Sequence, residues 1–261
     1  MNYHDKKYGQ SKIKSAKMRT LISIILSIFA CIEISKSDSL HRIESINPGS
    51  VTVGGISTGG AFASQFLVAH SSLVKGAGIY AAITNYCFYF HNSSFVCRDF
   101  PEEIAIENLI EQTLKLQDSN WIDATSNLKE ARVFVAHGMN DGTVNPGFAP
   151  VTQKYYGNFG SSIEMLTHLP ANHAVMTDGR GTECGTFNPP LIVEDCGFES
   201  VEAMFNHLYE DMKPGVEHGK WQGELIEFDQ VCALQTSNDL LFTKFLDSRE
   251  LRRGIFDIYD F

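Results

Sequence analysis

The segment Val51–Gly60 constrains the fold of this chain more than any other part of it. It begins as a β-branched run, which favours a buried strand, and residues 61–68 continue with apolar side chains at helical spacing. Gly55-Ile56-Ser57-Thr58-Gly59 lies between the two patterns. A serine in such a strand-to-helix turn adopts a strained backbone, and glycines two residues before and after it avoid a collision across the turn. The sequence therefore predicts a strand–turn–helix unit that raises the Ser57 hydroxyl above a sheet edge.

This turn also predicts chemistry. The backbone N–H of Thr58 and the helix N-terminus should point to the place where an oxyanion would form beside Ser57. We therefore expect Ser57 to be a nucleophile and Thr58 an oxyanion donor. The alternative is a glycine-rich turn that binds nothing or binds a phosphate.

The rest of the chain alternates between strand and helix patterns, which predicts an α/β fold with a mostly parallel sheet. The active site of such a sheet should lie at the carboxyl ends of its strands. Strands are expected at 51–56, 76–82, 131–136, 162–167 and 224–228, and helices at 58–70, 102–117 and 199–212. The last helix should pack one apolar face, made by Val201, Met204, Phe205, Leu208 and Tyr209.

Asp141 and His173 both follow predicted strands and should therefore lie at that edge. An imidazole can take the proton of a serine hydroxyl, and a carboxylate can fix its tautomer. Asp141 could instead only shape the Asn140-Asp141-Gly142 turn. His137 and His168 compete with His173 for the role of base, although His137 is expected to bond the loop backbone and His168 to be structural. We favour Ser57, Asp141 and His173, whose order matches that of α/β-hydrolases.

The N-terminal residues 1–37 resemble a secretory signal. Residues 1–19 carry a net charge of +5, and a 12-residue apolar core, Leu21–Ile32, follows them. That core is short for a membrane span, so we expect cleavage near Ser37, with an uncleaved anchor as the alternative. The start could be Met1 or Met18. The protein should then be secreted and free of the membrane.

The remaining residues should form one catalytic domain, 38–228, and a divergent tail, 229–261. The formal charge of the whole chain is −10, and −15 remains on residues 20–261 once the basic N-terminal segment is removed. A surface with this charge should repel nucleic acid and anionic membranes.

Six cysteines are present, of which Cys31 lies in the predicted signal. Cys87 and Cys97 are ten residues apart, and Cys184 and Cys196 are twelve apart, which in an oxidising compartment indicates two local disulfides. Cys232 would then be free. The spacings fit no common zinc pattern, and no cofactor is expected. Asn92 begins a glycosylation sequon inside the first cysteine loop.

These motifs together resemble a known family. The approach to Ser57 from Ile46, the segment from His137 to Pro146 and the region from His173 to Tyr209 are similar to the secreted, single-domain poly(3-hydroxybutyrate) depolymerases of the circularly permuted type. The resemblance covers about residues 46–228. It implies an extracellular serine esterase acting on polyesters or related short esters, with Ser57, Asp141 and His173 as its triad and disulfides 87–97 and 184–196.

The chain departs from this family in one respect. Only 19 residues separate the predicted mature start from Ser57, too few for the strands that precede the elbow of an ordinary α/β-hydrolase. A permuted chain would supply them after His173, but residues 229–261 lack the pattern. We therefore expect a permuted and incomplete sheet with an exposed edge strand and one nameable oxyanion donor, Thr58. Two hypotheses follow: an active secreted esterase, or a non-catalytic remnant of one.

Overall fold

A computed structural model describes residues 48–91, 93–186, 189, 192–209 and 212 of this protein. Its main sheet has four parallel strands in the order β1-β2-β3-β4. These are β1 Val51–Ile56, β2 Val74–Tyr80, β3 Arg132–Ala136 and β4 Ser162–Leu166. The last residues of all four strands are in register, so the strands end at one common edge.

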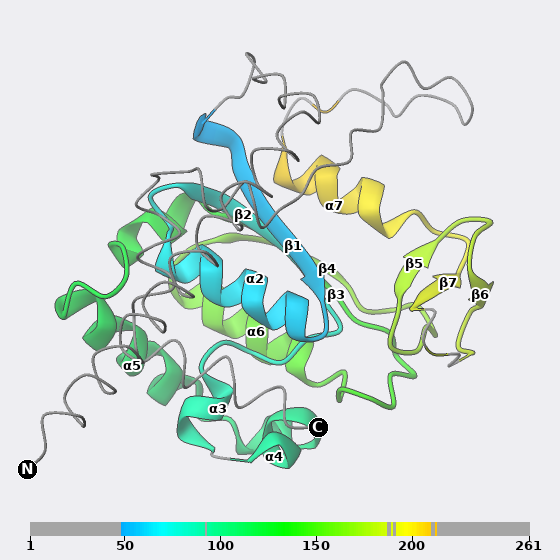
Figure 1. Cartoon of the computed structure of the whole chain (residues 1–261), viewed down its shortest axis with the longest axis horizontal. Coiled ribbons are helices and arrows are strands. Elements are labelled where there is room, and N and C mark those ends of the chain that lie inside the picture. Colours follow the sequence, from blue (N-terminus) through cyan, green and yellow to red (C-terminus); the bar gives the residue numbers. More distant parts are fainter. Residues whose placement is uncertain (1–47, 92, 187–188, 190–191, 210–211, 213–261) are drawn as a thin grey trace, which may run out of the picture. The chain divides into compact units, whose positions relative to one another are not determined.

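Helices cover both faces of this sheet (Figure 1). On one face, α2 Thr58–Ala69 and α6 Phe148–Asn158 pack on the strands, and α5 Ile106–Asp118 packs against α6. On the other face, α7 Ser200–Leu208 lies over β2 and β3. Strand side chains alternate between the two cores, as period 2 requires: Val133 and Val135 face the first, whereas Phe134 and Ala136 face the second.

A second, small sheet of three short parallel strands, in the order β5-β7-β6, follows β4. Its strands are β5 Val175–Thr177, β6 Thr182–Glu183 and β7 Val193–Asp195. Two short helices, α3 Cys87–Phe90 and α4 Ser94–Asp99, follow β2, and 3-10 turns occur at Pro48–Ser50, Pro101–Glu103 and Thr125–Glu130. The predicted disulfides Cys87–Cys97 and Cys184–Cys196 are both formed.

The four expected strands that fall within the described residues, and the helix after Ser57, are confirmed to within two residues at each end, but two other helices differ. The helix expected over 102–117 begins only at Ile106, because Pro101 starts a 3-10 turn and Ile104 is extended, with its side chain buried. The helix expected over 199–212 ends at Leu208, since Tyr209 is extended and its hydroxyl bonds Thr52 Oγ1 at 2.6 Å.

The expected apolar face of that last helix is also partly wrong. Met204 and Leu208 are buried, but Phe205 points outward and is 37% exposed. Helix α6 and the small sheet were not predicted.

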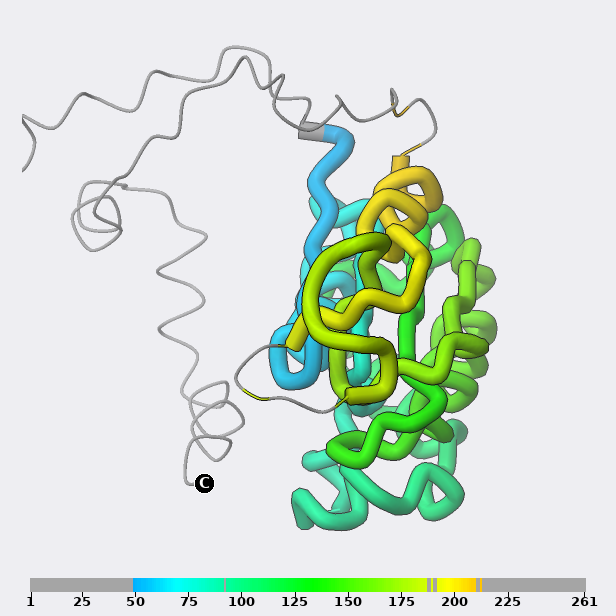
Figure 2. The backbone as a smooth tube through the Cα atoms, turned by 90° about the vertical axis from the view of Figure 1, so that its right-hand side faces the viewer, coloured from blue at the N-terminus to red at the C-terminus, as the bar shows by residue number. Residues whose placement is uncertain are grey.

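Among the described residues, strand β1 lies at the edge of the main sheet, in agreement with the exposed edge strand that the sequence predicted. In Figure 2, turned so that the small sheet faces the viewer, the blue tube of β1 runs along one side of the described part of the chain. The predicted signal, Asn92, the 224–228 strand, Cys232 and the tail lie outside the described residues. Among the helices of the described residues, none has the length and apolar character needed to cross a bilayer.

Candidate active site

Ser57 occupies the tight turn between β1 and α2, with φ 59° and ψ −123°. This left-handed backbone is rare for a residue with a side chain and matches the strain predicted for a nucleophile elbow. The Ser57 N–H donates to Tyr80 O at 2.9 Å, which continues the ladder of β1 with β2 and fixes the turn. Helix α2 begins at the next residue, Thr58, whose N–H has no acceptor within the helix.

The two glycines of the elbow are not equivalent. A Cβ on Gly55 would lie 2.5 Å from the carbonyl carbon and oxygen of Gly59, so this position must be glycine. A Cβ on Gly59 would meet no described atom within 4 Å, which contradicts the prediction that both glycines avoid a collision across the turn. The second crowded position is Gly60, where a Cβ would lie 2.8 Å from Ala82 Cβ, because α2 packs closely on the end of β2.

Asp141 and His173 meet in the structure, as predicted. Asp141 Oδ2 accepts from His173 Nδ1 at 2.9 Å, and both side chains are nearly buried. The acid belongs to the loop after β3 and the histidine to the loop after β4, here called the acid loop (137–145) and the histidine loop (167–174). A carboxylate on Nδ1 leaves Nε2 free to act as a base.

The Asp141 carboxylate has acceptor contacts on both oxygens. Oδ1 accepts the N–H groups of Thr143 at 2.8 Å and Val144 at 2.9 Å. Burial alone would raise the pKa of Asp141, but hydrogen bonds from His137, His173 and the Val144 N–H outweigh it and hold the pKa well below its usual range. The acid is therefore ionised at neutral pH and ready to orient a histidine.

The two rival histidines occupy different places. His137 Nε2 lies 3.0 Å from Val144 O, which confirms that it bonds the loop backbone, and also 3.0 Å from Asp141 Oδ2. One N–H on Nε2 can serve both oxygens, so His137 supports the acid from inside the protein. His168 is exposed.

The acid loop and the histidine loop are bound closely to each other. Met139 N donates to Leu169 O at 2.9 Å and Asn140 N to Ala171 O at 3.0 Å. A Cβ on Gly138 would lie 2.2 Å from Ala171 O, so only glycine allows this approach. The contacts fix the two loops as one unit beneath the Asp141–His173 pair.

Ser57 shares the sheet edge with this pair. Ile56, Tyr80, Ala136 and Leu166 are register partners along the four strands, and Ser57 directly follows the first of them. The acid and histidine loops begin directly after the last two strands. The sheet therefore gathers the three predicted site residues at one edge.

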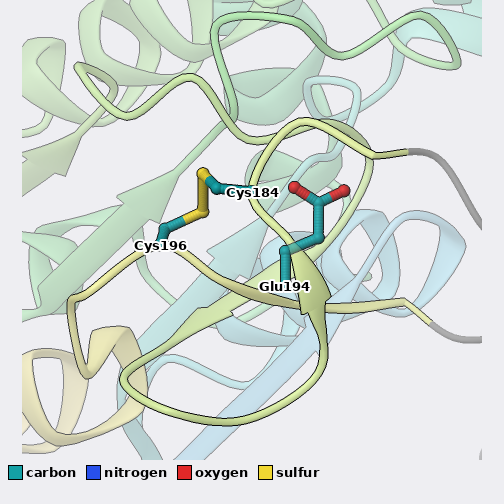
Figure 3. Close-up of side chains that lie close together, drawn as sticks. All are labelled: Cys184, Glu194 and Cys196. Carbon is teal, nitrogen blue, oxygen red and sulfur yellow. A yellow bond between two sulfur atoms is a disulfide. The ribbon is translucent and has the colours of Figure 1, made fainter.

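One further group has the composition of a metal site. Ligand atoms of Cys184, Glu194 and Cys196 lie within 4.8 Å of one another (Figure 3). The two sulfurs are bonded to each other, however, and a disulfide offers no thiolate to a metal. Glu194 Oε2 already accepts two backbone N–H groups, from Asn172 and Gly185. While the disulfide is intact, this group is a structural one.

Comparison with known proteins begins with two curated relatives. The chain is 32% identical over 190 residues to a poly(3-hydroxybutyrate) depolymerase of Delftia acidovorans, covering 71% of this chain and 38% of that protein. It is 26% identical over 194 residues to a polyhydroxybutyrate depolymerase of Talaromyces funiculosus, covering 71% of this chain and 55% of that protein. The chain is a homologue of the poly(3-hydroxybutyrate) depolymerases. No family model matches it.

Solved structures of these depolymerases share the fold. The crystal structure of a PHB depolymerase from Penicillium funiculosum matches with a TM-score of 0.57 and 26% identity, over 65% of this chain and 54% of that one. A serine-to-alanine variant of a PHB depolymerase, complexed with an R3HB trimer, matches with a TM-score of 0.55 and 26% identity, over 69% of this chain and 56% of that one. The fold is therefore α/β-hydrolase-like. The chain spans between about two fifths and just over half of the length of the depolymerases it matches.

Proposed function

We propose that this depolymerase homologue is a secreted serine esterase that hydrolyses ester bonds of poly(3-hydroxybutyrate)-like polyesters or related short esters. The observation that carries the proposal is the buried Asp141–His173 hydrogen bond at the same sheet edge as the strained Ser57 elbow. The depolymerase homologues support the choice of ester, and one related structure holds an R3HB trimer.

In the proposed reaction, Ser57 Oγ attacks the ester carbonyl carbon while His173 Nε2 takes the hydroxyl proton. Asp141 holds the imidazole by Nδ1 and stabilises the imidazolium. The tetrahedral intermediate carries its negative charge on the former carbonyl oxygen, near the Thr58 N–H and the N-terminus of α2. Collapse breaks the bond to the alcohol oxygen, which receives the proton from His173. A water activated by the same histidine then hydrolyses the acyl-enzyme and restores Ser57.

Secretion is part of this proposal. Two disulfides indicate an oxidising compartment, and the N-terminal 37 residues have the charge and apolar pattern of a signal. Glycosylation at Asn92 would be consistent with the same route.

A fluorophosphonate probe on the purified chain tests the proposal, because covalent labelling requires an activated serine. We expect labelling of the wild type at Ser57, identified by peptide mass spectrometry, and none of Ser57→Ala. Thr58→Ala is the matched control, since it keeps the backbone N–H and should keep labelling. A folded wild type that the probe does not label would overturn the proposal.

A second candidate is a non-catalytic homologue, and one observation favours it. In the described residues β1 is an edge strand, and the Thr58 N–H is the one oxyanion donor that we can assign. Losing a donor lowers kcat by about 10²–10³-fold in enzymes that use two. Hydrolysis of a short 3-hydroxybutyrate ester distinguishes the candidates: measurable turnover that Ser57→Ala removes would exclude the non-catalytic one.

A further inference from the structure

Glu194 is a buried carboxylate for which the proposed reaction has no use. It lies in the middle of β7 and is 2% exposed. None of the described Lys, Arg or His side chains forms an ion pair with it. Removing a carboxylate from water costs several kcal/mol, so an unpaired one is unfavourable unless its hydrogen bonds do something that an apolar residue could not.

Those hydrogen bonds lead to the active site. Glu194 Oε2 accepts the N–H of Asn172 at 3.0 Å and that of Gly185 at 2.6 Å. Asn172 directly precedes His173, and Gly185 directly follows Cys184 of the disulfide. In Figure 3 the Glu194 side chain leaves its strand beside this disulfide and points toward the neighbouring loop. One carboxylate oxygen therefore joins the disulfide-bonded segment to the histidine loop.

The side chain of Asn172 makes the next connection. Its Oδ1 accepts the N–H of His173 at 2.8 Å and the N–H of Gly142, which directly follows the acid, at a longer 3.4 Å. The same amide oxygen thus contacts the backbone of His173 itself and the backbone of Gly142, the residue after Asp141. An aspartate or a serine in place of Asn172 would change the charge or the reach of this acceptor.

The contacts that bind the two loops elsewhere do not reach His173. The backbone bonds from Met139 and Asn140 end at Leu169 and Ala171, and the small sheet resumes with Val175, whose N–H donates to Ile192 O. Between Ala171 and Val175, the hydrogen bonds that hold the loop to other segments run through Glu194 Oε2, Asn172 Oδ1 and the Asp141 carboxylate. The orientation of the His173 backbone therefore depends on the first two.

We propose that Glu194 and Asn172 are positioning residues that set the direction of the His173 ring toward Asp141 and Ser57, with Glu194 acting through Asn172. This inference rests on the proposed function of the site. Neither residue takes part in proton transfer. Because a displacement of about 1 Å can cost about 10²-fold in rate, loss of either acceptor should lower kcat about 10- to 100-fold.

The test uses kcat and KM for a short ester, measured on variants that keep their folded circular dichroism spectrum. Glu194→Ala and Asn172→Ala should each lose kcat with KM changed less than about twofold. Glu194→Gln keeps an acceptor oxygen and should recover most of the activity. Asp195→Asn is the matched control, because Asp195 is the exposed neighbour whose carboxylate accepts the N–H groups of Gly179 and Gly197, neither of which belongs to the histidine loop. It should behave as the wild type.

A double variant and an NMR signal separate this proposal from the proposed function. If the two residues act in sequence, Glu194→Ala/Asn172→Ala should be no slower than the worse single variant, whereas multiplied losses would overturn the linkage. The downfield proton resonance of His173 Nδ1–H reports the bond to Asp141 even in a protein without turnover. It should broaden or shift in both alanine variants and stay unchanged in Asp195→Asn. An unchanged resonance in the alanine variants would overturn the positioning role, whether or not the protein is an esterase.

Discussion

The two ends of the common sheet edge are built very differently. The Asp141–His173 pair is nearly buried. The acid-loop backbone and Glu194 of the small sheet both bond the histidine loop, and His137 bonds the Asp141 carboxylate. The Ser57 turn belongs to the edge strand β1, whose residues are half-buried or exposed. Among the described residues, two crowded glycines, the Ser57 N–H bond to Tyr80 O and the Ala61 N–H bond to Ser57 O fix it.

The difference shows that the Asp141–His173 pair is fully assembled in the described residues, whereas the surroundings of Ser57 are only partly described. The proposed acid and base, Asp141 and His173, are hydrogen-bonded to each other within the described residues. Ser57, the proposed nucleophile, has its strained backbone and the N-terminus of α2, but one proposed oxyanion donor, Thr58. What the described residues leave unassigned in the proposed site is therefore a second oxyanion donor beside β1, and not the acid–histidine pair.

The largest effect should follow from breaking the pair itself. Asp141→Asn replaces two acceptor oxygens by one, so at least two of the four donors around the carboxylate lose their acceptor. We expect kcat to fall by about 10⁴-fold through loss of the correct histidine tautomer. Steady-state hydrolysis of a short ester measures this.

Asp123→Asn is the control for this loss. Asp123 accepts two hydrogen bonds from Ser72, which lies just before β2, at the amino ends of the strands and away from the proposed site. Equal losses in the two variants would mean that the acid–histidine pair has no special role in turnover.

The two disulfides should separate stability from activity. Each closes a short loop, so replacing either pair by serines should lower the free energy of unfolding by about 2–4 kcal/mol. Only the loss of Cys184–Cys196 should also lower kcat, because Gly185 and Glu194 connect that loop to the histidine loop. Urea unfolding with kinetics on the same samples tests this. A larger kcat loss without Cys87–Cys97 would show that the α3–α4 segment, not the small sheet, supports the site.

The elbow offers a matched pair of glycine substitutions. Gly55→Ala places a Cβ 2.5 Å from the Gly59 backbone and should destabilise the protein by about 1–3 kcal/mol as β1 or α2 shifts. Gly59→Ala enters open space and should leave the melting temperature unchanged or slightly raised. Thermal unfolding of the two variants compares them directly. Equal destabilisation would mean that Gly59 is as crowded as Gly55, contrary to the contacts of the described residues.

The smallest effect concerns acid. The pKa of Asp141 is depressed in the folded protein, so its contribution to stability is present above the ordinary aspartate pKa of about 3.9 and is lost as the pH falls below it. At pH 3 the loss should be only about 1 kcal/mol, since one pH unit corresponds to about 1.4 kcal/mol per proton. Urea unfolding at pH 5 and pH 3 measures it. Asp141→Asn should lack this part of the pH dependence, and identical slopes in both proteins would contradict the depressed pKa.

Local patterns in the sequence determined the main sheet and the three candidate residues. Strands β1 Val51–Ile56 and β3 Arg132–Ala136 consist mostly of apolar and β-branched residues, and both pack against helices, as this composition favours. Because parallel strands end at one edge, Ser57, Asp141 and His173 could be placed together from their positions after strands alone. The cysteine pairs followed from their short spacing.

Tertiary contacts decided the rest, because no local pattern encodes them. Helix α6 has only a weakly amphipathic sequence with a proline in its first turn, and its tyrosines Tyr155 and Tyr156 are buried by α2 and α5 rather than by a clear apolar stripe. Glu194 is one acid in a three-residue strand, and nothing near it in sequence shows that its carboxylate reaches Asn172, 22 residues earlier. Likewise, Gly55 and not Gly59 is the constrained glycine of the elbow, because crowding depends on where the helix backbone returns over the strand. The sequence determined that Ser57, Asp141 and His173 lie at the carboxyl edge of the sheet. Three-dimensional packing determined which other residues, such as Glu194 and Gly55, contact and position their loops.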